Sequence, residues 1–219
     1  MRKAGASVAR RRTLCPSSAG VTAAPEVLCR LGWFATALAG FQRGGFRAGR
    51  TVAIHGGSGL LGSCAALVAG ALGAAEVRLV GRRPEQMVEI AALDPRIVVE
   101  AADDNTPVDF VLDCAGGSAV EGTKALIARL ARFGAIAFVG ALADALPVPT
   151  SVLMRNSQRL VGSFWFDRTQ TRETLALIAS GAIDLSPFKA TTFGLHQITD
   201  AMSHSIAHSG GLRHVALKP

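Results

Sequence analysis

The sequence feature that most restricts the fold is a glycine-rich segment, HGGSGLLG, at residues 55–62. It follows a short apolar run, TVAIH, that is typical of a buried strand, and it opens an Ala-rich segment at 59–72 that is typical of a helix. A turn that binds a dinucleotide needs glycine where it bends, where diphosphate approaches the backbone, and where helix and strand pack. The spacing Gly57-x-Gly59-x-x-Gly62 meets these needs. The alternative is a glycine-rich turn that only lets the helix pack on the strand and binds no ligand, because it would have a similar sequence.

Apolar runs alternate with helical segments along the rest of the chain, which predicts a doubly wound parallel sheet covered on both faces. Only the segment AADDNTPVD joins the third and fourth strands, and it is too short for a crossover helix. The C-terminus reads as strand, helix, glycine break and strand. We expect an α/β, Rossmann-type fold of about six strands, with further strands at 76–80, 96–100, 109–115, 135–140 and 159–165 and helices at 84–93, 118–134 and 168–181.

The positive charge is concentrated at the N-terminus. The net charge is +7, and five of the basic residues lie within the first 12 positions, before any acidic residue appears. The remainder has no basic stripe with interleaved aromatics, and the chain contains no tyrosine, so nucleic-acid binding is not expected. We predict a flexible basic arm at 1–23, whose composition also resembles a transit peptide, and one domain at 24–219.

Cysteine spacing and hydropathy indicate the cellular compartment in which the protein is expected. The four cysteines lie far apart, without a C-x-x-C pair, so neither a disulfide framework nor a zinc knuckle is indicated. No apolar run approaches the roughly 20 residues of a membrane span. We therefore expect a cytoplasmic protein without membrane association.

The end of the second strand indicates which coenzyme the turn would hold. A carboxylate at this point contacts the ribose hydroxyls of NAD, whereas a small residue followed by arginine accommodates the extra phosphate of NADP. Here Gly81 stands at the acidic position, and Arg82 and Arg83 follow. Glu85 lies beyond Pro84, in the first turn of the next helix. NADP(H) is the predicted coenzyme; the alternative is that both arginines are solvated loop charges.

Ligands of such folds bind at the carboxyl ends of the strands. Asp113 at one strand end is a candidate catalytic carboxylate or a buried structural one, and no catalytic residue is assigned. The residues expected to contact the coenzyme are Gly57, Ser58, Gly59, Leu60, Leu61, Gly62, Gly81, Arg82, Arg83, Cys114, Ala115, Gly116, Val139, Gly140 and Ala141.

Several segments, in order, resemble the medium-chain dehydrogenase/reductase superfamily, which includes the zinc-type alcohol dehydrogenases and quinone reductases. They are AAPEVLCRLGWFATAL, GRTVAIHGGSGLLGS, FGAIAFVG, RLVGSF, LALIASGAIDL and HVALKP. The resemblance covers about residues 24–219 and matches the C-terminal, nucleotide-binding half of such an enzyme. It implies a Rossmann domain that holds NADPH, hydride transfer to or from a carbonyl, alcohol or enone, and a homodimer formed by sheet-edge pairing.

The departures from that family concern its catalytic half. A GroES-like catalytic domain is largely absent from the sequence, so the chain is expected to be either part of a longer protein or a shortened form. Cys29 matches a position that supplies a zinc ligand in zinc-type members. A catalytic zinc takes three protein ligands, and no cluster completes the set, so no zinc is predicted and Cys29 is expected to be buried. His204 and His208, spaced i, i+4, are expected on a solvated helix face.

Two functions follow from this sequence. The first is an NADP(H)-dependent oxidoreductase that acts on a small molecule, with the coenzyme carrying the chemistry. The second is a catalytically silent nucleotide-binding or dimerisation module. A short-chain reductase would need a Tyr-x-x-x-Lys pair, which a chain without tyrosine cannot supply.

Overall fold

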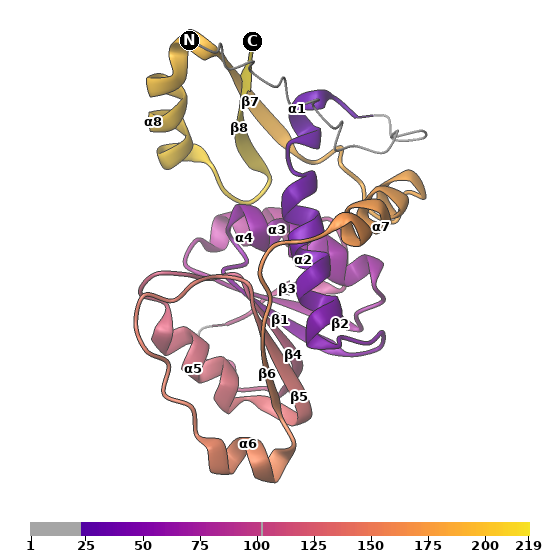
Figure 1. Ribbon diagram of the computed structural model, residues 1–219, viewed down its shortest axis with the longest axis vertical. Helices are drawn as coiled ribbons and strands as arrows, with labels where there is room; N and C mark the ends of the chain where they lie inside the picture. Colours follow the sequence, from indigo (N-terminus) through magenta and orange to yellow (C-terminus); the bar gives the residue numbers. More distant parts are fainter. Residues whose placement is uncertain (1–22, 102) are drawn as a thin grey trace, which may run out of the picture.

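A computed structural model describes residues 23–101 and 103–219, so nearly all of the basic arm predicted at 1–23 lies outside the described part. Six parallel strands form the central sheet, in the order β3-β2-β1-β4-β5-β6. This is the predicted Rossmann-type topology (Figure 1). The strands are β1 (Thr51–His55), β2 (Glu76–Val80), β3 (Ile97–Val99), β4 (Val108–Asp113), β5 (Leu130–Phe138) and β6 (Arg159–Gly162).

Alternation along the strands sends side chains into two cores, one on each face of the sheet. Val52 and Ile54 of β1 join a core with α2 and α3, whereas Ala53 between them joins a core with α5. The strands are therefore apolar on both faces, as parallel strands covered by helices must be. The flanking helices are α2 (Leu31–Gly44), α3 (Leu60–Ala71), α4 (Pro84–Ala91), α5 (Val120–Ala128), α6 (Thr150–Asn156) and α7 (Arg168–Ala179).

A smaller unit lies beyond the carboxyl ends of the strands, in the upper part of Figure 1. Strands β7 (Lys189–Gly194) and β8 (Arg213–Lys218) form a separate two-stranded parallel sheet, joined by α8 (Ile198–His208), and α1 (Pro25–Leu28) contacts β7. Gly210 and Gly211 have φ angles of 142° and 50° between α8 and β8. The predicted order of strand, helix, glycine break and strand is confirmed. No helix in the described ranges has the length and apolar character to cross a bilayer.

The helix predicted at 118–134 is wrong at its C-terminal end. Helix α5 stops at Ala128, and β5 starts at Leu130, which pairs with Val108 and is buried. The apolar spacing that suggested a longer helix is satisfied by a strand instead. Before the regular ladder resumes at Ala135, β5 bulges outward, and Phe133 takes the left-handed φ of 65°.

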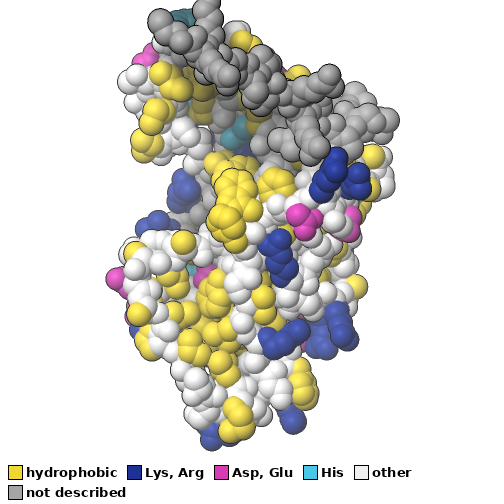
Figure 2. Space-filling model, in the orientation of Figure 1, with side chains coloured by type: hydrophobic (Ala, Val, Ile, Leu, Met, Phe, Trp, Pro, Cys, Tyr) yellow, Lys and Arg dark blue, Asp and Glu magenta, His cyan; other side chains and the backbone are white. Residues whose placement is uncertain are grey.

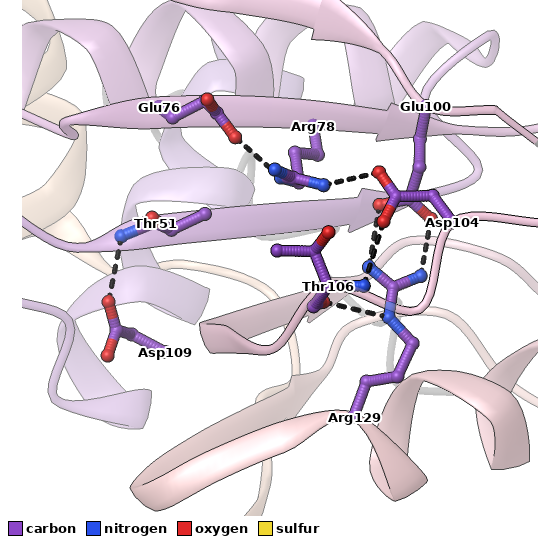
Figure 3. Close-up of polar contacts among 8 residues, drawn as sticks. All are labelled: Thr51, Glu76, Arg78, Glu100, Asp104, Thr106, Asp109 and Arg129. Atoms are coloured by element: carbon purple, nitrogen blue, oxygen red, sulfur yellow. Dashed lines mark hydrogen bonds and ion pairs between the residues drawn. The ribbon is translucent and has the colours of Figure 1, made fainter.

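The described residues of the connection between β3 and β4 form no helix, in line with the prediction, and ion pairs hold them instead (Figure 3). Arg129 donates to both carboxylate oxygens of Glu100, at 2.6 and 2.8 Å, and to the carbonyl of Thr106 at 3.1 Å. Arg78 contacts Asp104 within the same connection. Hydrogen bonds from Thr106, together with the charges of Arg78 and Arg129, lower the pKa of Asp104 to about 2. The connection is thus tied to both β2 and the start of β5.

Candidate functional site

The glycine-rich turn after β1 is bound to the end of the neighbouring strand. The amides of Gly56 and Gly57 both donate to the Val80 carbonyl of β2, at 2.8 and 2.9 Å, and the Gly59 amide donates to the Gly56 carbonyl at 2.9 Å. Gly56 has a φ of 79°, which only glycine adopts readily. The first glycine of the turn therefore reverses the chain at the point where β1 and β2 end side by side.

Close packing explains the last glycine of the motif. A Cβ at Gly62 would lie 2.2 Å from the Gly56 carbonyl oxygen and 2.7 Å from the Gly57 Cα, so no larger residue fits without moving the helix. Helix α3 begins immediately after Gly59, its N-cap, without a side-chain cap. Among the described residues, no acceptor takes the amides of Leu60, Leu61 and Gly62. A helix N-terminus with free amides attracts anions.

A groove of about 600 Å³ opens beside this turn, at the carboxyl ends of β1, β2 and β4. Eight of the predicted coenzyme contacts line it: Ser58, Gly59, Gly81, Arg82, Arg83, Cys114, Ala115 and Gly116. No aspartate or glutamate is among its described lining residues, so arginine dominates its charge. A groove of this size, with a positive wall, suits a phosphorylated ligand.

The other predicted contacts lie around the groove and shape it. Gly57, Leu60, Leu61 and Gly62 form the turn and the first turn of α3. A Cβ at Gly140 would lie 1.6 Å from the Ala115 carbonyl oxygen, so the chain after β5 touches the chain after β4. The Gly117 amide then donates to the Ala141 carbonyl at 2.9 Å. Val139 packs toward Gly40 of α2, away from the groove.

Sequence reasoning missed five lining residues: His55, Gly56, Ser118, Ala119 and Gly122. Of these, His55 is the last residue of β1, and the rule that ligands bind at strand ends could have found it. Ser118, Ala119 and Gly122 enter the groove because α5 begins over the end of β4. Periodicity of a single segment carries no information on that packing.

His55 belongs to a buried polar cluster beneath the groove. Its Nδ1 lies 3.2 Å from an Asp113 carboxylate oxygen, and the hydroxyl of Thr123 donates to the other oxygen at 2.8 Å. The Ala115 amide also donates to Asp113, at 3.0 Å. The Asp113 side chain is fully buried and faces partners on three elements, so it acts as the structural anchor of the loop after β4, which the sequence had left open.

Arg82 and Arg83 are exposed at the end of β2, where they were predicted, and neither pairs with a carboxylate of the described chain. Arg83 donates to the Ser209 carbonyl at 3.3 Å, which directs it along the groove wall toward the C-terminal unit. Glu85 lies in the first turn of α4, as expected. Gly81 leaves room for Ser58, because a Cβ there would lie 3.1 Å from the Ser58 hydroxyl.

The C-terminal unit supports the turn directly. The Gly211 amide donates to the Ser58 carbonyl at 2.9 Å, and the Ser63 hydroxyl donates to the Gly211 carbonyl at 2.7 Å. The glycine break before β8 therefore fixes both the turn and the start of α3. A link across some 150 residues of chain could not be read from local sequence pattern.

The cysteines and histidines show no metal centre in the described residues, where no three His, Cys, Asp or Glu side chains gather. Cys29 was expected to be buried, which is wrong: it directly follows the short helix α1 and is exposed. The imidazole rings of His204 and His208 lie 4.5 Å apart on α8.

The two other cysteines of the described chain have raised pKa values. Burial raises the pKa of the Cys64 thiol to about 11. Burial, together with the nearby Asp113 charge, raises the pKa of the Cys114 thiol well above its ordinary value.

The sheet order and the glycine turn at the end of β1 define a Rossmann-type α/β domain. A family model described as zinc-binding dehydrogenase matches residues 61–180, which is more than half of the chain. The chain therefore belongs to the zinc-binding dehydrogenase family, as its resemblance to the medium-chain enzymes predicted. No curated protein matches the sequence.

Solved structures share this fold at low sequence identity. Alcohol dehydrogenase TADH from Thermus sp. ATN1 is 21% identical, with a TM-score of 0.76, over 91% of this chain and 60% of that one. TarJ from S. aureus, in complex with NADPH, is 15% identical, with a TM-score of 0.73, over 90% and 66%. Alcohol dehydrogenase rspB from E. coli CFT073, complexed with NADH, is 14% identical, with a TM-score of 0.77, over 90% and 60%. The chain thus spans less than two thirds of each.

Proposed function

We propose that the chain binds NADP(H) in the groove beside the glycine turn and serves an oxidoreductase of the alcohol dehydrogenase or quinone reductase type. The reaction would transfer hydride to or from a carbonyl, alcohol or enone. The observation that carries the proposal is a groove with two kinds of anion-binding group on its walls: free amides at the start of α3, and two arginines that form no ion pair with the described residues.

Each part of the groove has a role in this proposal. The amides of Leu60, Leu61 and Gly62 would hold the diphosphate, because the helix dipole adds to their hydrogen bonds. Arg82 and Arg83 would bind the phosphate that distinguishes NADP from NAD. His55 and Asp113 hold the loop at Ala115 in place. When bound, the coenzyme supplies or accepts the hydride.

The fold neighbours include complexes with NADPH and with NADH, so the preference between the two must rest on the residues of this chain. Isothermal titration of the full chain should give tighter binding of NADPH than of NADH. The Arg82→Ala, Arg83→Ala double variant should lose affinity for NADPH by at least tenfold and for NADH by less. Equal losses for both coenzymes would refute the assignment of the arginines, and no binding of either would refute the site.

Activity is a separate proposal, because the chain is shorter than its structural neighbours. The alternative is a module that binds the coenzyme and turns over nothing. NADPH oxidation, followed by absorbance with a panel of aldehydes, ketones and quinones, separates the two. Oxidation above the rate without substrate supports the enzyme, whereas background rates together with measured binding support the silent module.

We also propose a cytoplasmic homodimer formed at the β6 edge of the sheet. β6 is the outermost strand, and Phe164, just beyond it, is 84% exposed. An open strand edge beside exposed aromatics favours pairing with a second copy. Sedimentation should show a dimer that Phe164→Asp dissociates and that Met154→Asp, an exposed site on α6, leaves intact. A monomer at micromolar concentration would refute this pairing.

A further inference from the structure

A second groove lies at the opposite end of the sheet from the glycine turn, where β1, β4 and β6 begin. Its volume is about 480 Å³. We call it the arginine groove, after Arg47, Arg50 and Arg159 on its wall, with Asp109, Phe46 and Phe133. We propose that the arginine groove binds a small organic phosphate: a phosphate group on Arg47 and Arg159 and a flat apolar body against Phe133.

The charge of the arginine groove is not balanced internally. Asp109 is its one acidic lining residue in the described chain, and Arg50 pairs with it at 2.9 Å. The second carboxylate oxygen of Asp109 accepts the Thr51 amide at 3.0 Å. Arg47 has no ion pair with the described residues, and Arg159 donates only to the Gly44 carbonyl, at 3.2 Å. Two guanidinium groups are therefore free to meet a dianion.

Arg159 is held in place for such a role. Its guanidinium packs beside Gly45, where a Cβ would lie 3.1 Å from both terminal nitrogens, and Gly45 itself has a φ of 71°. Arg47 follows two residues later, in the loop after α2. Figure 2 shows Lys and Arg side chains gathered low on the right of this face, near the end of α2.

The apolar wall of the arginine groove combines an exposed aromatic ring with left-handed backbone. Phe133 is 61% exposed, sits in the β5 bulge with a φ of 65°, and has the Arg132 guanidinium 5.0 Å from its ring centroid. Ser157, with a φ of 52°, lines the same groove. Among the described non-glycine residues, three have positive φ, and two of these line the arginine groove. Strained backbone of this kind clusters at ligand sites.

The groove is separate from the coenzyme site because parallel strands put their starts and their ends at opposite edges of the sheet. The two grooves share no lining residue in the part of the chain that the structure describes. Binding in the arginine groove therefore does not depend on the proposed function, and variants can distinguish the two sites.

Isothermal titration of the full chain with phenyl phosphate, and with inorganic phosphate as the second probe, tests the proposal. Phenyl phosphate should bind at least tenfold more weakly to Arg47→Gln, Arg159→Gln than to the parent. The matched control Arg82→Gln, Arg83→Gln, in the coenzyme groove, should bind it unchanged. Phe133→Gly, which also relieves the left-handed strain, should weaken phenyl phosphate but leave inorganic phosphate unaltered.

The single variant Arg47→Gln controls for misfolding of the double variant. Arg47 contacts no partner in the described chain, so the melting temperature of this variant should match that of the parent. That single variant should still lose several-fold in affinity for phenyl phosphate. The proposal is overturned if phenyl phosphate does not bind, if the coenzyme-groove variant loses it instead, or if both double variants lose it equally. Unchanged binding to the Arg47 and Arg159 double variant overturns it as well.

Discussion

Arg129 grips both carboxylate oxygens of Glu100, at 2.6 and 2.8 Å, and joins the end of α5 to the connection that leaves β3. Their side chains are only 9% and 5% exposed. The charge of Glu100 helps to raise the pKa of the Arg129 guanidinium, and hydrogen bonding to Glu100 is the largest cause. A bidentate, buried pair thus ties the connection after β3 to the start of β5.

Removing one member of this pair should be costly. Arg129→Met leaves the Glu100 carboxylate buried without its partner, and we expect a loss of about 3 kcal/mol in the free energy of unfolding. Glu100→Leu together with Arg129→Met should recover a part of that loss, since no lone charge remains. Urea unfolding of the single and double variants measures the loss of unfolding free energy and its partial recovery. A loss below about 1 kcal/mol for Arg129→Met would show that the connection is held by other contacts.

Gly62→Ala should disrupt the glycine turn. The new methyl group would collide with the Gly56 carbonyl at 2.2 Å, so α3 must shift away from β1. We expect a drop in melting temperature of several degrees and loss of NADPH binding in titration. Gly162→Ala is the matched control, because a Cβ there meets nothing within 4 Å. Equal stability of the two variants would contradict the packing role of Gly62.

Gly81→Asp should reverse the coenzyme preference. A carboxylate at the end of β2 can accept the ribose hydroxyls of NADH and repels the phosphate of NADPH. The new Cβ would meet the movable ends of Met87 and Ser58, both at 3.1 Å, and the Ser58 amide nitrogen at 3.3 Å, so the fold should tolerate the change after a shift of a few tenths of an ångström. Titration should show a fall of at least tenfold in the NADPH to NADH affinity ratio. An unaltered ratio would mean that this position does not face the ribose.

His214 should make stability depend on pH near neutrality. Its Nδ1 accepts a hydrogen bond from Arg30 at 3.0 Å, and burial, with the Arg30 charge, lowers its pKa below the ordinary value of 6.5. The unfolded chain therefore takes up a proton first as pH falls, and stability declines from about pH 6.5 down to the folded pKa. Urea unfolding at pH 7.5 and 5.5 should show this decline.

The variant His214→Asn should flatten that pH dependence, because it removes the titrating ring but keeps an acceptor for Arg30. His208→Asn, at an exposed position on α8, serves as the control and should retain the parent slope. Identical slopes for the parent and both variants would assign the dependence to other groups.

Cysteine reactivity should follow exposure. Cys29 is exposed, whereas burial raises the pKa of Cys64 to about 11 and raises that of Cys114 well above its ordinary value. Thiolate is the reactive form. Peptide mapping after brief iodoacetamide treatment at pH 8 should find Cys29 labelled well before Cys64 and Cys114. Labelling of Cys114 at the rate of Cys29 would contradict its partial burial in the groove wall.

The parts of the fold that sequence could predict are those encoded locally. The strand at 51–55, the glycine turn and the helix after it follow from composition over twenty residues, and the structure has all three. The position of the arginines at the end of β2 could also be predicted, because they directly follow the strand in the sequence and therefore lie at its end in the structure. The missing helix between β3 and β4 followed from chain length alone.

The failures have a common origin in contacts between distant segments. The start of β5 at Leu130 depends on its pairing with Val108 and on the ion pair between Arg129 and Glu100, so the helical periodicity of the sequence was misleading there. Cys29 was assigned to the interior from its residue type, yet it follows α1, a helix of four residues with no buried residue. Similarly, Gly122 reaches the groove only because α5 packs over β4.

The bulge in β5 divides that strand into two segments that pair with β4 in different registers. From Val108 to Phe110 the register advances by two positions on β4, whereas from Leu130 to Ala135 it advances by five on β5, so β5 holds three extra residues at the bulge. Length changes at Phe133 can therefore be absorbed before the ladder resumes, without displacing Phe138 and the glycines beyond it. This position offers an insertion point for a reporter or a tether on a sheet that otherwise has little tolerance for one.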